Sequence, residues 1–272
     1  MSDLRLLAVF AHPDDESFGI GGTLAKYASE GVRVTLICAT RGEVGQISDP
    51  SLATPDRLGE VREGELRCAC AALGVLDLRF LDCIDGQVGT CGAVETEGKI
   101  VRAIRELRPN VVVTFGPDGI YGHADHVAIG YLTTAAFHSA ADPAKFADQL
   151  RDGLAPFAAQ KLYYAAVSRS SFRRMRDEAA AAGVRFDLGD IDLEHFGVED
   201  DVITTVIDVS DFLDQKWQAI QCHRTQIQPN GPFSKAPAEL RRRFMGQESY
   251  TLAVSRVKVR KTPETDLFEG IA

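Results

Sequence analysis

Two short polar segments carry imidazole and carboxylate side chains at a density that is unusual for a chain with six histidines. The first reads Ala-His-Pro-Asp-Asp-Glu over residues 11–16, and the second ends in His-Ala-Asp-His over residues 123–126. Imidazole nitrogens and carboxylate oxygens suit Zn²⁺ or a similar divalent ion. Catalytic zinc takes three protein ligands and leaves one position open for water. His12 and Asp15 plus one histidine of the second segment supply that number, so the pattern predicts a catalytic metal site.

Taken alone, the first segment has a simpler explanation. Acidic side chains are favoured at a helix N-terminus, where they cap N–H groups and face the positive end of the helix dipole. However, three adjacent carboxylates (Asp14, Asp15 and Glu16) repel one another unless a cation lies between them. A second cluster, His123, Asp125 and His126, also follows a predicted buried strand. Two such clusters together favour the metal interpretation.

These segments resemble the motifs of the PIG-L/LmbE-like family of zinc-dependent N-deacetylases. The matching residues are His12-Pro13-Asp14-Asp15-Glu16 and Tyr121-Gly122-His123-Ala124-Asp125-His126. The family includes deacetylases of mycothiol and bacillithiol synthesis and N-acetylglucosaminyl-phosphatidylinositol deacetylases. The resemblance covers most of the chain and implies a hydrolase that removes the N-acetyl group of a GlcNAc-containing small molecule. Weaker matches are Gly42-Glu43, Arg62 with Glu65 and Leu66, Asp85, and His223-Arg224-Thr225-Gln226.

The resemblance implies a role for each matching residue of the metal site. His12, Asp15 and His126 would bind Zn²⁺, with Fe²⁺ as the alternative metal. Asp14 would be the general base that takes a proton from the metal-activated water.

The same resemblance assigns the remaining steps. His123 would stabilise the oxyanion or protonate the leaving amine, with Asp125 tuning it. Tyr121 would contribute to oxyanion stabilisation, with a packed rim residue as the alternative. The substrate's polar oxygens would be held by three residues: Arg62, Asp85 and Glu43.

Three positions leave room for other interpretations. Ala124 stands where many members carry proline. Arg62 could instead form a surface ion pair with Glu60 or Glu63. His223 lies in a segment reminiscent of mycothiol S-conjugate amidases, so amide hydrolysis of thiol S-conjugates is the alternative function; core or helix-terminal packing is the other explanation for this histidine.

Strand and helix signals alternate over the first 140 residues, as the metal site requires. Apolar runs predict strands over residues 4–10, 32–39, 76–81 and 111–115. Helical spacing predicts helices over residues 21–30, 58–73 and 94–107. This alternation predicts a Rossmann-like α/β fold, a mostly parallel sheet with helices on both faces. Ligands bind beyond the carboxyl ends of such strands, so loops 11–17 and 116–126 should meet.

After about residue 142 the alternation is less regular. We expect strands over residues 162–167 and 202–209, helices over 169–182 and 210–223, and a loop over 225–237. The chain is thus predicted to form a single LmbE-like deacetylase domain over residues 1–272. Residues 1–142 would be the metal-binding core and residues 143–272 a C-terminal α/β extension.

Composition limits the partners. The net charge of −9 argues against nucleic acid as a partner. The sequence contains no run of 18 consecutive apolar residues, so no membrane span is expected. The six cysteines contain no Cys-x-x-Cys pair, which indicates reduced thiols and a cytoplasmic protein. Two basic stretches, residues 241–243 and 258–261, are interpreted as solvent-exposed faces. A small amino sugar is the expected partner, and a homo-oligomer is left open.

Two other classes of protein share this fold. A nucleotide-binding oxidoreductase is suggested by Gly19, Gly21 and Gly22, but the fingerprint requires a third glycine where Leu24 stands. A non-catalytic metal-bound module would need no general base, yet every proposed catalytic group is present. An N-deacetylase therefore accounts best for the sequence.

Overall fold

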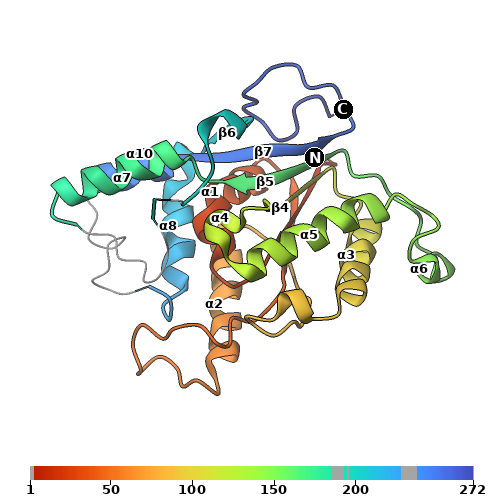
Figure 1. The fold of residues 1–272 in the computed structure, drawn as a ribbon, viewed down its shortest axis with the longest axis horizontal. Coiled ribbons are helices and arrows are strands. Elements are labelled where there is room, and N and C mark those ends of the chain that lie inside the picture. Colours follow the sequence, from red (N-terminus) through yellow and green to blue (C-terminus); the bar gives the residue numbers. More distant parts are fainter. Residues whose placement is uncertain (1–2, 185–192, 195, 228–237, 272) are drawn as a thin grey trace.

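One sheet of seven strands runs through the whole computed structural model, which describes residues 3–184, 193–194, 196–227 and 238–271 (Figure 1). The strand order is β3-β2-β1-β4-β5-β7-β6. Strands β1 to β5 pair in parallel, whereas β7 is antiparallel to both neighbours. The strands are β1 Arg5–Phe10, β2 Arg33–Cys38, β3 Asp77–Phe80, β4 Val111–Phe115, β5 Lys161–Ala166, β6 Thr205–Asp208 and β7 Gln247–Ser255.

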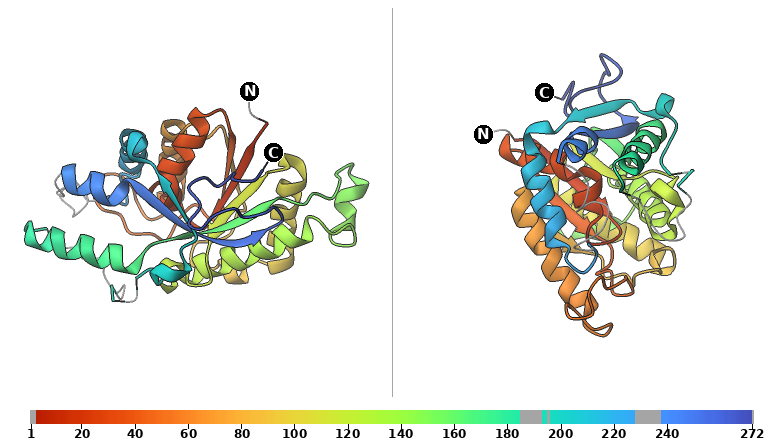
Figure 2. Two further views of the ribbon diagram at one scale, coloured as in Figure 1. Left: turned by 90° about the horizontal axis from the view of Figure 1, so that it is seen from above. Right: turned by 90° about the vertical axis from the view of Figure 1, so that its left-hand side faces the viewer.

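Helices cover both faces of this sheet. Helices α1, α2 and α8 pack together on one face, and α3 and α5 pack on the other (Figure 2). The predicted Rossmann-like α/β fold is therefore confirmed. The α-helices are α1 Asp15–Ser29, α2 Leu58–Leu73, α3 Ala93–Leu107, α4 Gly119–Gly122, α5 Ala124–Ser139, α6 Ala147–Arg151, α7 Arg169–Ala181, α8 Leu213–Cys222 and α10 Ala238–Met245. Single 3₁₀ turns lie at η1 Val88–Thr90, η2 Asp200–Val202 and η3 Ser210–Phe212.

The apolar runs form the central strands as expected. All five residues of β4 are buried, as are the last five of β1. Strands with both faces covered exclude water from the backbone and read as continuous apolar runs. Because β1 and β4 are parallel neighbours, the loops that follow their carboxyl ends begin side by side at the same edge of the sheet.

Several predicted boundaries were wrong. Helix α1 begins at Asp15 rather than at residue 21, so the acidic residues lie in its first turn. The predicted loop over residues 116–126 ends early, because α5 begins at Ala124. Strand β7 was not predicted. Of the predicted loop 225–237, only residues 225–227 lie within the described part of the chain.

The prediction that all cysteines are reduced was also wrong. Cys68 on α2 is bonded to Cys222 at the end of α8, and Cys83 is bonded to Cys91. The first pair is separated by 154 residues, so only the packing of α2 against α8 brings the two thiols together. Cys38 and Cys70 are free and buried.

Two further features bear on the sequence analysis. Among the described residues, no helix has the length and apolar character that crossing a bilayer requires. In the basic stretches, the side chains of Arg242, Arg243 and Lys261 are exposed. The division into a core and an extension stays a prediction.

Candidate metal and catalytic site

The two polar segments meet where β1 and β4 end. His12 follows β1 and Asp15 opens α1, whereas His126 lies in the first turn of α5, just beyond β4. His12 and His126 are 114 residues apart in sequence, yet His12 Nδ1 lies 3.3 Å from His126 Nε2. The sheet order thus makes the juxtaposition that the topology predicted.

His12, Asp15 and His126 form a triangle of ligand atoms. Asp15 Oδ1 lies 3.3 Å from His126 Nε2, and Asp15 Oδ2 lies 3.6 Å from His12 Nδ1. Tetrahedral zinc with bonds of about 2.0–2.1 Å keeps its ligands roughly 3.3 Å apart. The donor set and its spacing therefore fit a divalent ion.

The outer nitrogen of His12 is held by two carboxylates. His12 Nε2 lies 3.1 Å from Asp85 Oδ1 and 3.3 Å from Asp125 Oδ2. Asp125 in turn accepts the backbone N–H groups of Gly86 and Val88 at 2.6 and 3.0 Å. Metal-binding histidines usually donate their other N–H to such a group, which fixes the ring. Asp125 therefore supports His12, and its backbone N–H also donates to His123 Nδ1 at 3.2 Å. Its expected tuning of His123 stays a prediction; burial lowers the pKa of that imidazole, and the charge of Asp125 opposes this shift.

The ring of His126 is also held in place by its neighbours. Its ring stacks on Phe115 of β4 at a centroid distance of 3.9 Å. Its Nδ1 lies 3.2 Å from the carbonyl oxygen of Gly119, which leaves Nε2 to face His12.

Two other groupings are also close enough to bind a metal. One is His12, His123 and His126, and the other is His12, Asp85 and Asp125. The second uses the outer nitrogen of His12, which already has two carboxylate partners. In the first grouping, Asp15 is a better third ligand than His123, because Asp15 contacts both His12 and His126.

Asp14 has an unusual backbone conformation. Its φ is 114° and its ψ −29°, a conformation that residues other than glycine rarely adopt. It precedes α1 without making a side-chain capping hydrogen bond, so the capping explanation does not hold for it. Its Oδ2 lies 3.1 Å from Arg62 Nη2, and its backbone N–H donates to Glu16 Oε2 at 3.0 Å. Burial raises the pKa of Asp14 to about 6, although the charge of Arg62 opposes the shift.

Arg62 is buried within the site rather than paired at the surface. Its Nη1 donates to the carbonyl of Gly42 at 2.8 Å, and its Nη2 donates to that of Pro13 at 2.6 Å. Glu60 and Glu63 pair with other arginines. The carboxylate that Arg62 contacts is that of Asp14, so Arg62 forms an ion pair with the proposed general base.

Glu43 and Asp85 tie two loops together. Glu43 Oε1 accepts the backbone N–H of Asp85 at 3.0 Å, and Asp85 Oδ2 accepts that of Val44 at 3.2 Å. Their expected contact with substrate stays a prediction.

His123 and Tyr121 lie beside the triangle. The His123 ring lies 4.9 Å from that of His12 and 4.6 Å from that of His126. Burial lowers the pKa of His123, and the charges of His126 and His12 lower it further. The Tyr121 ring lies 5.8 Å from His123, and burial raises its pKa.

The pKa values of two of the proposed ligands, Asp15 and His12, shift in opposite directions. Burial raises the pKa of Asp15, but His126 and His12 outweigh it and hold the pKa well below its usual range. Burial lowers the pKa of His12, but hydrogen bonds to Asp125, Asp15 and Asp85 raise it well above its usual range. Both shifts reflect the close approach of carboxylates and imidazoles at this site.

Two contributors were missed by the sequence analysis. Glu16 was quoted in the motif without a role, although its carboxylate holds Asp14. Phe196 stacks on Tyr121 at 5.8 Å, and Gly197 N–H donates to the carbonyl of Ile120 at 2.8 Å. No local pattern could link residue 196 to residue 121, because the fold alone brings them together.

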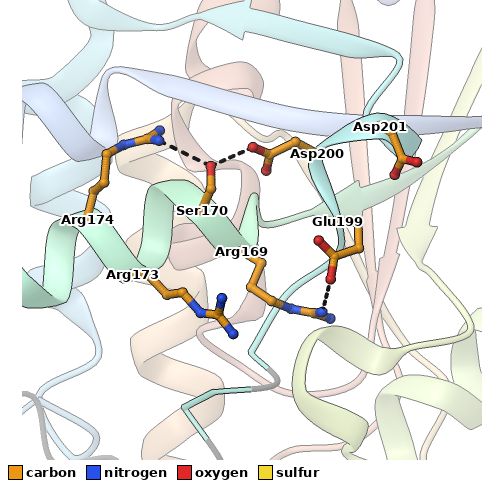
Figure 3. Close-up of a pocket in the computed structure, with 7 residues that line it drawn as sticks. All are labelled: Arg169, Ser170, Arg173, Arg174, Glu199, Asp200 and Asp201. Atoms are coloured by element: carbon orange, nitrogen blue, oxygen red, sulfur yellow. Dashed lines mark hydrogen bonds and ion pairs between the residues drawn. The ribbon is translucent and has the colours of Figure 1, made fainter.

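A separate hollow of about 510 Å³ lies along α7 and η2, away from the triangle. Several of its charged groups are paired with one another: Arg169 contacts Glu199, and Ser170 links Arg174 to Asp200 (Figure 3). It contains none of the motif residues.

Residues 7–137 match the PIG-L family, described as GlcNAc-PI de-N-acetylase. Across its full length the chain is 36% identical to all of the 1D-myo-inositol 2-acetamido-2-deoxy-alpha-D-glucopyranoside deacetylase of Thermobispora bispora. It is 40% identical to the enzyme of that name from Streptomyces avermitilis, over 100% of this chain and 99% of the other. The chain belongs to the PIG-L family. The resemblance seen in the sequence is therefore confirmed, and this PIG-L protein is an N-deacetylase, a hydrolase that cleaves an amide bond.

Solved structures share the PIG-L protein's fold. The N,N'-diacetylchitobiose deacetylase of Pyrococcus horikoshii superposes with a TM-score of 0.69 at 22% identity, covering 91% of this chain and 83% of the other. A conserved protein of Thermus thermophilus superposes with a TM-score of 0.62 at 27% identity, covering 97% and 99%.

Proposed function

We propose that this PIG-L protein removes the acetyl group from the acetamide of a GlcNAc-containing small molecule, with a GlcNAc–inositol conjugate as the first candidate. The observation that carries the proposal is the triangle of His12, Asp15 and His126, with the His123 ring beside it and Asp14 close enough to interact electrostatically with Asp15 and His12. The inositol substrate is supported by full-length identity to deacetylases whose names specify it.

His12, Asp15 and His126 would hold the metal, for which we propose Zn²⁺, with Fe²⁺ as the alternative. A bound divalent ion lowers the pKa of water and polarises the carbonyl of the amide. The residues around it then carry the protons.

Asp14 takes the proton from the attacking water. A raised pKa of about 6 makes its carboxylate a better proton acceptor near neutral pH than an ordinary aspartate. Arg62 keeps the carboxylate ionised and oriented. His123 donates a proton to the leaving nitrogen, and the Tyr121 hydroxyl donates a hydrogen bond to the developing oxyanion.

Release of a free amine tests this function. Purified enzyme is given GlcNAc–inositol, N,N'-diacetylchitobiose and an N-acetylated thiol S-conjugate, each with and without chelator. We expect chelator-sensitive amine release that is fastest from GlcNAc–inositol. Fastest cleavage of the S-conjugate would favour the amidase alternative, and chelator-insensitive turnover would contradict the metal site.

Asp14→Asn tests the base. It should keep the metal and lower kcat by about 10²–10⁴-fold, the usual contribution of a general base. His126→Ala should instead lower the bound zinc measured by elemental analysis. Wild-type kcat in Asp14→Asn would remove Asp14 from its role.

A cytoplasmic location and the oligomeric state stay predictions.

A further inference from the structure

A buried pair that the mechanism above does not use lies next to Asp14. His223 Nε2 lies 2.8 Å from Glu16 Oε1, and the two side chains are 0% and 1% exposed. The residues are 207 positions apart in sequence. Glu16 belongs to the first motif and His223 to the late segment whose role was left open.

Glu16 connects this pair to Asp14. Its second oxygen, Oε2, accepts the backbone N–H of Asp14 at 3.0 Å. Because the φ of Asp14 is 114°, its backbone is strained and persists only where surrounding contacts hold it. Asp14 is thus held at its N–H by Glu16 and at its carboxylate by Arg62.

His223 is itself firmly placed. The preceding residue, Cys222, is bonded to Cys68 on α2. Two residues later, Thr225 donates through both its N–H and its hydroxyl to Glu65 of α2, at 2.8 and 2.7 Å. Helix α2 also carries Arg62. The Glu16 contact and the Arg62 contact of Asp14 therefore both depend on the position of this one helix.

Stability alone is a weak reason for such a pair, since apolar side chains of similar volume often serve as well as a buried ion pair. The same helix layer provides a comparison. Lys216 on α8 lies 2.6 Å from Glu248, with side chains 4% and 2% exposed. Glu248 accepts the N–H groups of Gly22 and Thr23 in α1, two turns away from the metal triangle.

We propose that His223 is a positioning residue that acts through Glu16 to hold Asp14 in the orientation its proton transfer requires. This inference rests on the proposed role of Asp14 as general base. His223 donates to Glu16, Glu16 accepts from Asp14, and the strained backbone keeps the Asp14 carboxylate beside Arg62.

Single variants separate this role from packing. His223→Ala should lower kcat by about 10–100-fold, because displacement of a reacting group by about 1 Å costs rate rather than binding. KM and bound zinc should stay near the wild-type values. His223→Gln should recover part of kcat, since its amide N–H can donate to Glu16. Lys216→Met is the matched control: it should lower Tm while kcat stays unchanged. If His223→Ala does not fold, the shorter amide of His223→Asn replaces it.

A double-mutant cycle decides between the proposals. In an Asp14→Asn background, His223→Ala should cause no further loss of kcat, because its effect passes through Asp14. An equal fold loss in both backgrounds would overturn the inference. Wild-type kcat in His223→Ala, beside an inactive Asp14→Asn, would overturn it while leaving the base intact. Wild-type kcat in Asp14→Asn would instead overturn the proposed function.

Discussion

At the scale of single residues, the space around the Arg62 guanidinium decides whether Asp14 is held in place. A Cβ at Gly42 or Gly45 would overlap the Arg62 side chain, and Gly42 also has a φ of +65°. These glycines allow the loop after β2 to close over the guanidinium and offer it the Gly42 carbonyl. The weak Gly42-Glu43 match in the sequence thus has a steric cause.

Gly42→Ala should therefore displace Arg62 from Asp14. We expect kcat/KM to fall by roughly 10²-fold, the usual cost of misplacing a group at an active site. Gly31→Ala is the control, because Gly31 has a φ of +84° but nothing within 4 Å of the added Cβ. Equal losses of activity in the two variants would show that backbone strain, and not Arg62, is responsible. Steady-state kinetics with thermal melts distinguishes the two.

The charge of His223 gives a pH dependence of stability. Burial lowers its pKa, but the carboxylates of Glu16, Asp14 and Glu65 outweigh burial and raise the pKa above 6.5. A raised pKa in the folded state means that the folded protein binds more protons than the unfolded chain between the two values. The stabilisation is therefore complete below about pH 6.5 and is lost as the pH rises through the folded value.

We expect urea unfolding of the wild type to show this loss relative to His223→Gln. The difference in free energy of unfolding between the two proteins should shrink as the pH rises above about 6.5. A difference that stays constant as the pH rises above 6.5 would contradict a raised pKa.

At the scale of the secondary-structure elements, a segment from the second half of the chain supports the loop that carries Tyr121. Ile120 has a φ of 68°, and its carbonyl accepts the N–H of Gly197. Phe196 is stacked between Tyr121 and Phe172, at centroid distances of 5.8 and 4.2 Å. A strained loop of this kind needs an outside contact to keep one conformation.

Phe196→Ala should release Tyr121 and lower kcat by about 10-fold, with less effect on zinc content, because the triangle does not touch Phe196. In a Tyr121→Phe background the loss should be smaller. Phe157→Ala, which removes another half-buried ring packed on Arg108, should leave kcat unchanged. An undiminished loss in the Tyr121→Phe background would show that Phe196 acts elsewhere.

The elements also show what a sequence can predict. The runs of β1 and β4 are almost entirely apolar because both faces of these strands are buried, with Arg5 and Thr114 as the polar members. Helix α2 was predicted at its observed ends. The meeting of His12 with His126 followed from parallel topology alone. Strand β7 was missed because its sequence, Gln-Glu-Ser-Tyr-Thr-Leu-Ala-Val-Ser, mixes polar and apolar residues. Its Glu248 is buried because it pairs with Lys216 and accepts two backbone N–H groups of α1, contacts that only the folded chain provides. Contacts such as Phe196 on Tyr121 depend on tertiary packing that no local pattern records.

At the scale of the whole molecule, two disulfides brace the regions that flank the metal triangle. Cys83–Cys91 closes the segment that carries Asp85 and the two N–H groups bound by Asp125. Cys68–Cys222 joins α2, which carries Arg62, to the residue before His223. Spacing could not predict either pair, since a scattered set of six cysteines permits many pairings.

Loss of the long-range bridge should lower the stability of the whole chain. A cross-link that spans 154 residues restricts the unfolded chain strongly, so Cys68→Ser with Cys222→Ser should lower the free energy of unfolding by about 2–5 kcal/mol. Urea unfolding measures this change. A reductant should lower the free energy of unfolding of the wild type by a similar amount. It should have little effect on the double variant, because the short loop closed by Cys83–Cys91 restricts the unfolded chain less. Alkylation of the unreduced, denatured wild type should label two thiols, Cys38 and Cys70. Labelling of all six, with no change in unfolding on Cys68→Ser and Cys222→Ser, would show that the thiols are reduced, as the sequence first suggested.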